Sequence, residues 1–130
     1  METEVKQTES QEKVETAVRN IFPNITLQRV GKFLIGESSD ISSLSRFHQL
    51  LRQQAILDTA RSVMISNRRG GSTQLMLNKQ VAFVGKISFT DEKALLGPIV
   101  VTLEDTDIEH LIDYLAPRTH EGRPIREITY

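Results

Sequence analysis

Residues 97–117 read GPIVVTLEDTDIEHLIDYLAP, and two different apolar periods follow each other within this stretch. Ile99, Val101 and Leu103 alternate with other residues, which predicts a strand with one buried face. The second half of the stretch carries apolar side chains at helical spacing, which predicts a helix closed by Pro117. These side chains are Ile108, Leu111, Ile112 and Leu115. The stretch therefore predicts a fold that mixes strands and helices.

The same two periods, of strand and of helix, predict the secondary structure of the N-terminal part of the chain. Residues 4–8 are a weak strand candidate, and a helix follows that ends at Pro23. Either Ser10 or Thr8 can cap its first turn. Its apolar side chains are Val14, Ala17, Val18, Ile21 and Phe22. Residues 25–37 are apolar and extended, which fits either one bent strand or a short pair.

Cap and stop signals set the limits of the remaining helices. A polar cluster at residues 38–40 precedes a long helical region, and residues 70–71, both glycine, end it. The apolar face of this region is Leu44, Phe47, Leu50 and Leu51 at first, and then Ile56, Leu57, Ala60, Val63 and Met64. The change of face at residues 53–55 predicts a kink or two consecutive helices. Thr106 and Glu109 have the spacing of a capping box for the last helix.

The clearest predicted hairpin lies between the glycines and the last strand. Residues 73–77 and residues 81–89 each alternate apolar with other side chains. The tight turn between them is predicted at Asn78, Lys79 and Gln80. The alternation places Phe83 and Phe89 on the apolar face, so both rings are predicted to be core rather than platforms for stacked bases.

The predicted order of elements is roughly β-α-β-α-α-β-β-β-α. The predicted sheet is formed mainly by hairpins, and the helices do not alternate regularly with its strands. This order indicates an α+β fold, with a mostly antiparallel sheet and helices packed on one face. A chain of 130 residues with 38% hydrophobic positions predicts a single domain, residues 1–130, in which residues 117–130 form an irregular tail. The chain lacks cysteine, a secretion signal and a long apolar run, so we expect a cytoplasmic protein without disulfides or a membrane segment.

Charge is segregated along the chain although the formal net charge is only −1. Residues 46–86 contain seven basic side chains and one acid, Asp58, which gives a balance of +6, and residues 91–113 give −6. Concentrated positive charge indicates a polyanionic partner, most simply RNA. The acidic stretch offers a second explanation, because it can complement the basic stretch of another protein molecule.

Four strings of the sequence are more specific than a generic globular pattern. They are LRQQAILDTARS at residues 51–62, NKQVAFVG at residues 78–85, LGPI at residues 96–99 and LIDYLAPRT at residues 111–119. In combination they resemble a small archaeal family of uncharacterised proteins described as RNA-binding. The resemblance implies an α+β fold similar to the large-subunit ribosomal protein that contacts 5S RNA, and a distant similarity to a predicted exosome-associated protein. Because residues 1–8 are more charged than the opening strand of that family, we expect this strand at a sheet edge.

The predicted RNA-binding residues are Arg52, Arg61, Arg68, Arg69, Lys79, Gln80, Lys86 and Arg118. Arginine favours bidentate contacts with phosphate, and the glycines at residues 70–71 let the backbone approach a phosphate closely. Each position also has a simpler explanation that needs no ligand. These explanations are a solvated helix face with an Asp58 to Arg61 pair, a positively charged helix C-terminus, a polar turn and a solvated tail.

No pattern in the sequence predicts a catalytic residue, a metal site or a cofactor. His48, His110 and His120 are scattered along the chain, and the acids of residues 105–107 are explained by a helix start. Tyr114 is the best candidate for stacking on a base. We therefore predict a non-catalytic RNA-binding protein that uses an Arg- and Lys-rich surface. The alternative is a protein interaction module, or a homodimer that pairs basic and acidic halves.

Overall fold

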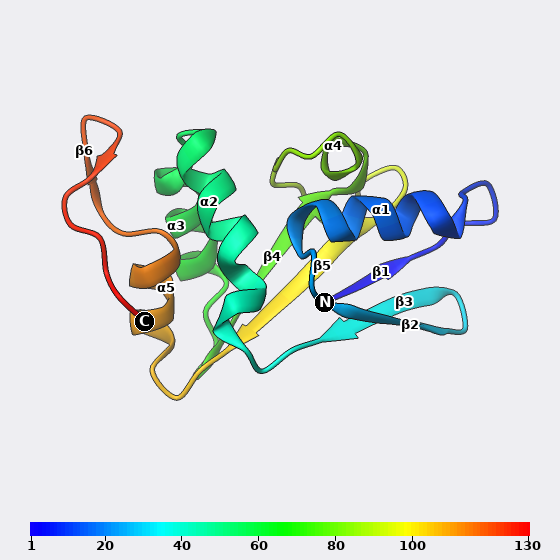
Figure 1. The fold of residues 1–130 in the computed structure, drawn as a ribbon, viewed down its shortest axis with the longest axis horizontal. Helices are drawn as coiled ribbons and strands as arrows, with labels where there is room; N and C mark the ends of the chain where they lie inside the picture. Colours follow the sequence, from blue (N-terminus) through cyan, green and yellow to red (C-terminus); the bar gives the residue numbers. More distant parts are fainter. The chain divides into compact units, whose positions relative to one another are not determined.

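The computed structural model describes residues 1–130 and contains a five-stranded sheet, a two-stranded sheet and five α-helices (Figure 1). The elements are β1 (Glu2–Glu4), α1 (Gln11–Ile21), β2 (Thr26–Val30), β3 (Phe33–Glu37), the 3-10 helix η1 (Ile41–Leu44), α2 (Ser45–Gln53), α3 (Leu57–Ser66), β4 (Ser72–Asn78), α4 (Lys79–Phe83), β5 (Pro98–Glu104), α5 (Ile108–Leu115), β6 (Thr119–His120) and β7 (Arg123–Pro124). The large sheet has the order β2-β3-β1-β5-β4, and β1 pairs antiparallel with both β3 and β5. The predicted α+β class is therefore confirmed. None of the helices is long and apolar enough to cross a membrane.

Strand β1 is central in the sheet, so the prediction of an edge strand is wrong. Thr3 lies opposite Leu34 on one side and Ile99 on the other, and its hydroxyl donates to the carbonyl of Pro98 at 3.1 Å. Side chains alternate between the two faces of a strand. A strand of three residues therefore buries only Thr3, and the charges of Glu2 and Glu4 belong to the opposite face. A charged sequence is compatible with a central strand when the strand is this short.

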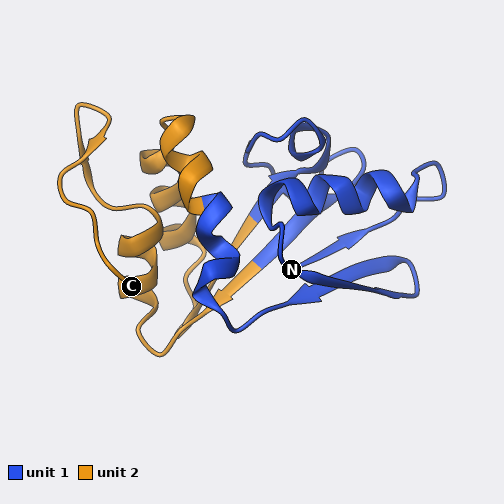
Figure 2. Ribbon diagram, viewed as in Figure 1, with its two compact units in different colours: residues 1–47, 76–101 blue, residues 48–75, 102–130 orange.

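The chain divides into two compact units, which Figure 2 shows in different colours. Unit 1 consists of residues 1–47 and 76–101, and unit 2 consists of residues 48–75 and 102–130. Strands β4 and β5 each contribute residues to both units. The single domain over residues 1–130 stays a prediction.

Unit 1 is built on the hairpin of β2 and β3 and on helix α1. Residues 25–37 therefore form a short pair of strands and not one bent strand. In this hairpin Val30 pairs with Phe33. The hydroxyl of Ser10 accepts a hydrogen bond from the backbone of Lys13 and caps α1, as predicted. Val14 of this helix packs in a buried cluster with Leu34 of β3, so α1 is held against the strands of unit 1 by its apolar face.

The short helix α4 replaces the predicted hairpin turn of unit 1. The side chain of Asn78 accepts a hydrogen bond from the backbone of Val81 at 2.9 Å, so Asn78 caps a helix instead of entering a turn. Strand β4 before it is correctly predicted, with every second side chain buried. The prediction of a core position is wrong for Phe83, whose side chain is exposed, and Phe89 is only half-buried. A helix of five residues is too short to display a helical period, so the alternation of residues 81–89 predicted a full strand. Of that strand, the structure contains an antiparallel bridge between Leu77 and Phe89.

Unit 2 contains helices α3 and α5, which pack together, and most of α2. The predicted interruption between α2 and α3 is confirmed, and Ala55 stands there with a positive φ of 55°. Helix α3 already ends with Asn67 as its cap, several residues before Gly70. The cap of α5 is Asp107, whose carboxylate accepts from the backbone of His110, and not the predicted capping box of the preceding threonine. The tail is partly ordered, because β6 and β7 form a small hairpin within the residues predicted to be irregular.

Candidate functional site

Three arginines of the predicted RNA-binding set form internal ion pairs in unit 2. Arg52 binds both carboxylate oxygens of Glu127, at 2.9 and 2.6 Å, and also donates to the carbonyls of His48, Tyr114 and Leu115. Arg61 donates to the carboxylate of Asp113 at 2.7 Å and to the carbonyl of Ala116 at 3.1 Å. Arg68 pairs with Glu109 of α5. The side chains of Arg52 and Arg61 are only 19% and 17% exposed, so their donors serve the fold of unit 2.

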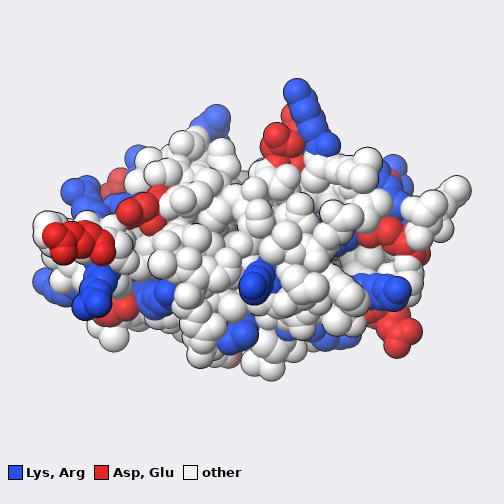
Figure 3. Space-filling model, turned by 90° about the horizontal axis from the view of Figure 1, so that it is seen from above, with Lys and Arg blue, Asp and Glu red and all other residues white.

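Basic and acidic side chains that are separated along the sequence therefore pair with each other in folded unit 2. Two acids of the stretch 91–113, Glu109 and Asp113, neutralise Arg68 and Arg61 of the basic stretch. The expected pair of Asp58 with Arg61 is absent, because Asp58 accepts a hydrogen bond from the hydroxyl of Thr119 instead. On the face drawn in Figure 3, basic and acidic side chains lie among one another and no broad basic area is seen.

Arg68, Arg69 and Arg118 are the exposed members of the predicted set in unit 2, and of these three only Arg68 forms an ion pair. The backbone groups of Arg69 and Ser72 exchange two hydrogen bonds, at 2.8 and 3.1 Å, which close a tight turn before β4. Gly71 approaches the start of the last helix closely, since a Cβ atom there would lie 3.0 Å from the carbonyl oxygen of Asp105. The second glycine therefore has a packing role in unit 2 that requires no phosphate.

Lys79 is buried in unit 1, which corrects its predicted position at an exposed turn. Its ammonium group donates to the carbonyl of Glu4 at 2.6 Å, the carboxylate of Glu9 at 2.9 Å and the carbonyl of Leu96 at 2.7 Å. The side chains of Lys79 and Glu9 are only 5% and 10% exposed. An ammonium group has three donors, and all three are used here. Lys79 is therefore unavailable to RNA and instead holds three segments of unit 1 together.

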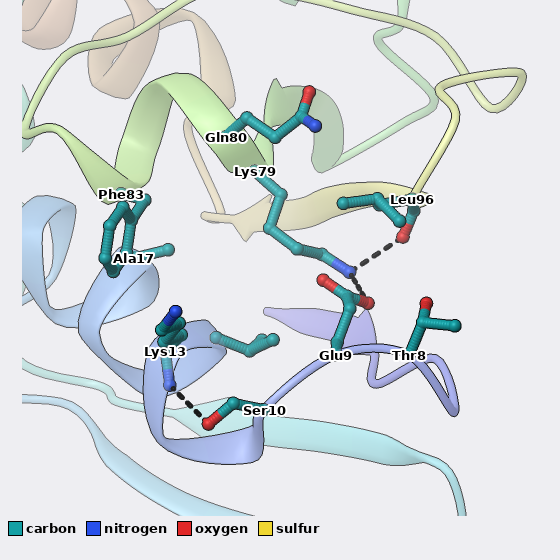
Figure 4. A pocket seen from close by; sticks show the side chains of 10 residues that line it. Thr8, Glu9, Ser10, Lys13, Ala17, Lys79, Gln80, Phe83 and Leu96 are labelled. Atoms are coloured by element: carbon teal, nitrogen blue, oxygen red, sulfur yellow. Dashed lines mark hydrogen bonds and ion pairs between the residues drawn. The ribbon is translucent and has the colours of Figure 1, made fainter.

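This buried ion pair forms part of the wall of a cavity of about 350 Å³ in unit 1 (Figure 4). The cavity lies between the turn before α1, the first turns of α1 itself, helix α4 and the loop before β5. Its lining combines apolar groups, including Ala17 and Leu96, with hydroxyl groups of Thr8 and Ser10. Helix α4 keeps its place because the side-chain amide of Asn20 donates to the last carbonyls of that helix, at 2.9 and 3.0 Å.

Three further side chains give the cavity features that suit a nucleotide. Phe83 contributes an aromatic ring that is 44% exposed, Gln80 contributes an exposed amide and Lys13 contributes an exposed ammonium group. Aromatic rings stack on unpaired bases, amides bind base edges and cations bind phosphates. Lys79 and Gln80 are the members of the predicted set that line the cavity, and of the two only Gln80 is exposed. Lys86 of the same unit is exposed in the loop that follows α4.

A row of four rings in unit 2 contains His48 and His110, which lie far apart in the sequence and were not predicted to be neighbours. His48 lies against Tyr114 with ring centroids 4.7 Å apart, Tyr114 lies 5.6 Å from Tyr130, and Tyr130 lies 5.4 Å from His110. Burial lowers the pKa of His48, and the positive charge of Arg52 lowers it further. The two hydrogen bonds from Arg52 hold the pKa of Glu127 below its usual value. The tail is thus attached to unit 2 both by the rings and by the Arg52 to Glu127 ion pair.

Comparison with known proteins identifies relatives along the whole chain. A family model described as RNA binding matches residues 1–105. A UPF0201 protein of Sulfurisphaera tokodaii is 44% identical over 98% of this chain and 92% of its own length. The chain belongs to the UPF0201 family. A relative from Archaeoglobus fulgidus named UPF0200/UPF0201 protein is also 44% identical, but this chain spans only 39% of its length.

Solved structures agree with this UPF0201 membership. A crystal structure described as that of an uncharacterized UPF0201 protein has a TM-score of 0.84 and 42% identity, covering 95% of this chain and 96% of the other. The UPF0201 protein of Methanococcus jannaschii also has a TM-score of 0.84, at 34% identity, covering 96% of each chain. A DUF54 protein of Archaeoglobus fulgidus has a TM-score of 0.66 at 23% identity, which shows a shared fold alone.

Proposed function

We propose that this UPF0201 chain binds RNA without catalysing a reaction on it, and that the cavity of unit 1 holds an unpaired nucleotide. One observation carries the proposal. The RNA-binding family model covers residues 1–105, and every residue that lines the cavity lies within that range. The ring row of unit 2 depends on His110, Tyr114 and Tyr130, which lie beyond it.

The chemistry of the cavity supports the same conclusion. Sequence-specific RNA-binding proteins mostly bind single strands and loops, whose unstacked bases insert between side chains. The exposed ring of Phe83 offers one stacking surface, and Lys13 adds a positive charge at the rim. Arg69, Lys86 and Arg118 are exposed as well and are proposed as additional phosphate contacts, whereas Arg52, Arg61 and Arg68 are committed to internal pairs.

The direct test compares Phe83→Ala with Val84→Ala. Both remove an exposed apolar side chain, 44% and 68% exposed respectively, but only Phe83 lines the cavity. Loss of one stacked base costs about 1–3 kcal/mol, so Phe83→Ala should weaken binding of single-stranded RNA about 5- to 150-fold. Val84→Ala should bind like the unchanged protein. Fluorescence anisotropy with single-stranded and hairpin RNA over a salt series measures both affinities, and log K should fall with log salt.

Undetectable binding of every RNA at low salt would overturn the proposal. Equal losses in the two variants would place the RNA contact outside the cavity. Neutralising Arg69 or Lys86 should flatten the salt slope by about 1, because each phosphate contact releases counterions.

A second candidate function is protein interaction, and one observation favours it. Phe83, Val84 and Leu95 of unit 1 are apolar and strongly exposed, as is typical of residues that contact a partner protein. In the Archaeoglobus relative, moreover, the region similar to this chain is 39% of a longer polypeptide. Sizing chromatography of Val84→Ser separates the functions, because a protein interface would be weakened by this change and RNA binding would not.

A further inference from the structure

The two oxygens of the Glu9 carboxylate are used unequally, although the side chain is nine-tenths buried. Oε1 accepts hydrogen bonds from the backbone of Lys6 at 3.0 Å and from the ammonium group of Lys79 at 2.9 Å. Figure 4 shows one oxygen of Glu9 joined to Lys79 and the other directed into the cavity. The cavity therefore presents a negatively charged acceptor to whatever enters it.

The arrangement favours a ligand that donates an N–H group to the other oxygen alone. The bidentate contact that a guanidinium group, or the paired N–H groups of a guanine edge, makes with a carboxylate uses both oxygens side by side. Oε1 already has two donors and is held by the Lys79 ammonium. A contact at the other oxygen alone suits a single donor, and the exocyclic amines of adenine and cytosine are donors of this kind.

We propose that the cavity takes an unpaired base with an exocyclic amine, adenine or cytosine, and discriminates against uracil. This inference rests on the proposed RNA binding. Uracil carries a carbonyl oxygen at the position where cytosine carries its amine, so the same pose would bring two acceptors together at Glu9. Phe83 stacks on the base, while Lys79 acts as a positioning residue that orients the carboxylate.

The test uses two RNA oligomers of equal length, oligo-C and oligo-U, and the full chain at neutral pH and low salt. Cytosine and uracil differ at this edge alone, where cytosine has an amine and an unprotonated N3 and uracil has a carbonyl and an N3–H group. Phosphate contacts therefore cancel in the ratio of affinities. We expect oligo-C to bind about tenfold more tightly, the value of one charge-assisted hydrogen bond at about 1.5 kcal/mol. Equal affinities would overturn this inference and leave RNA binding intact. Absence of binding to either oligomer would overturn the proposed function as well.

Two variants identify the group responsible for the discrimination. Glu9→Gln keeps the size of the side chain and adds an amide donor that uracil can accept, so the ratio of the two affinities should fall to about one. Phe83→Ala should weaken the binding of both oligomers while leaving the ratio of their affinities near tenfold, because stacking does not distinguish an amine from a carbonyl. Circular dichroism checks that Glu9→Gln is folded, since it also weakens the pair with Lys79. A ratio that is unchanged in folded Glu9→Gln, or lost in Phe83→Ala, would overturn the assignment.

Discussion

Lys79 in unit 1 and Arg68 in unit 2 belong to the same basic stretch of sequence, yet the fold gives them different environments. Lys79 is nearly fully buried, with three acceptors around its ammonium group, whereas Arg68 pairs with Glu109 at the surface. A buried charge has lost its hydration and depends on its partners, while an exposed pair is screened by water and salt. The difference teaches that a cation counted along a sequence indicates a ligand only when it is exposed and has no internal partner.

The largest effect is expected from removing the buried cation, Lys79. Lys79→Met keeps the aliphatic chain but removes the donor from the carboxylate of Glu9 and from two backbone carbonyls. Breaking a buried ion pair in this way should lower the free energy of unfolding by about 3–5 kcal/mol, measured by urea denaturation. Lys86→Met is the matched control, because Lys86 is exposed, and should change stability by less than about 0.5 kcal/mol. Similar stabilities for the two variants would contradict the structural role of Lys79.

The position of Lys79 also shows where prediction from the sequence ends. The periods of residues 97–117 correctly predicted β5 and α5, because each element is long enough to display its own period. The partners of Lys79 lie 75, 70 and 17 residues away along the chain, and no local pattern connects them. Asn78 was the one available signal, since asparagine is a favoured helix cap, and recognising it would have replaced the predicted turn by a helix.

A smaller but clear effect is expected at Arg52, which is the most highly bonded arginine of unit 2. Arg52→Met removes the guanidinium donor from the carbonyls of His48, Tyr114 and Leu115 and releases Glu127 of the tail. We expect a loss of about 1–3 kcal/mol in the free energy of unfolding. Arg69→Met, at an exposed arginine, should lie within about 0.5 kcal/mol of the unchanged protein. If both variants lost the same free energy of unfolding, the internal hydrogen bonds of Arg52 would contribute nothing that the exposed Arg69 lacks.

Acid should loosen the tail of unit 2. His48 has a pKa below its ordinary 6.5 in the folded state, so the imidazole that is exposed when the tail detaches binds a proton more readily, and stability falls as the pH drops below 6.5. The pKa of Glu127 is also lowered, from 4.5, so its contribution is present above pH 4.5 and is lost on further acidification. The two tyrosines, Tyr114 and Tyr130, both belong to the ring row, and there is no tryptophan, so tyrosine fluorescence reports on this region alone.

The control for this titration is His48→Gln, which cannot take up a proton at the imidazole. The groups that face His48 are Arg52, Glu127 and Tyr114, and none of them is changed by the substitution. We expect the fluorescence change between pH 6.5 and 4.5 to disappear, while the change below pH 4.5 remains. A change that persists above pH 4.5 in this variant would assign the transition to another group.

The smallest effect is expected for the exposed pair of Arg68 and Glu109, which is the opposite extreme from Lys79. A double-mutant cycle of Arg68→Gln and Glu109→Gln measures their coupling in urea denaturation, and we expect about 0–1 kcal/mol. The coupling should shrink further in high salt, because both side chains are exposed. A coupling as large as the loss in Lys79→Met would remove the distinction between buried and surface cations. A coupling within the expected range would show that the surface pair of Arg68 contributes little to stability, in contrast to the buried ion pair of Lys79.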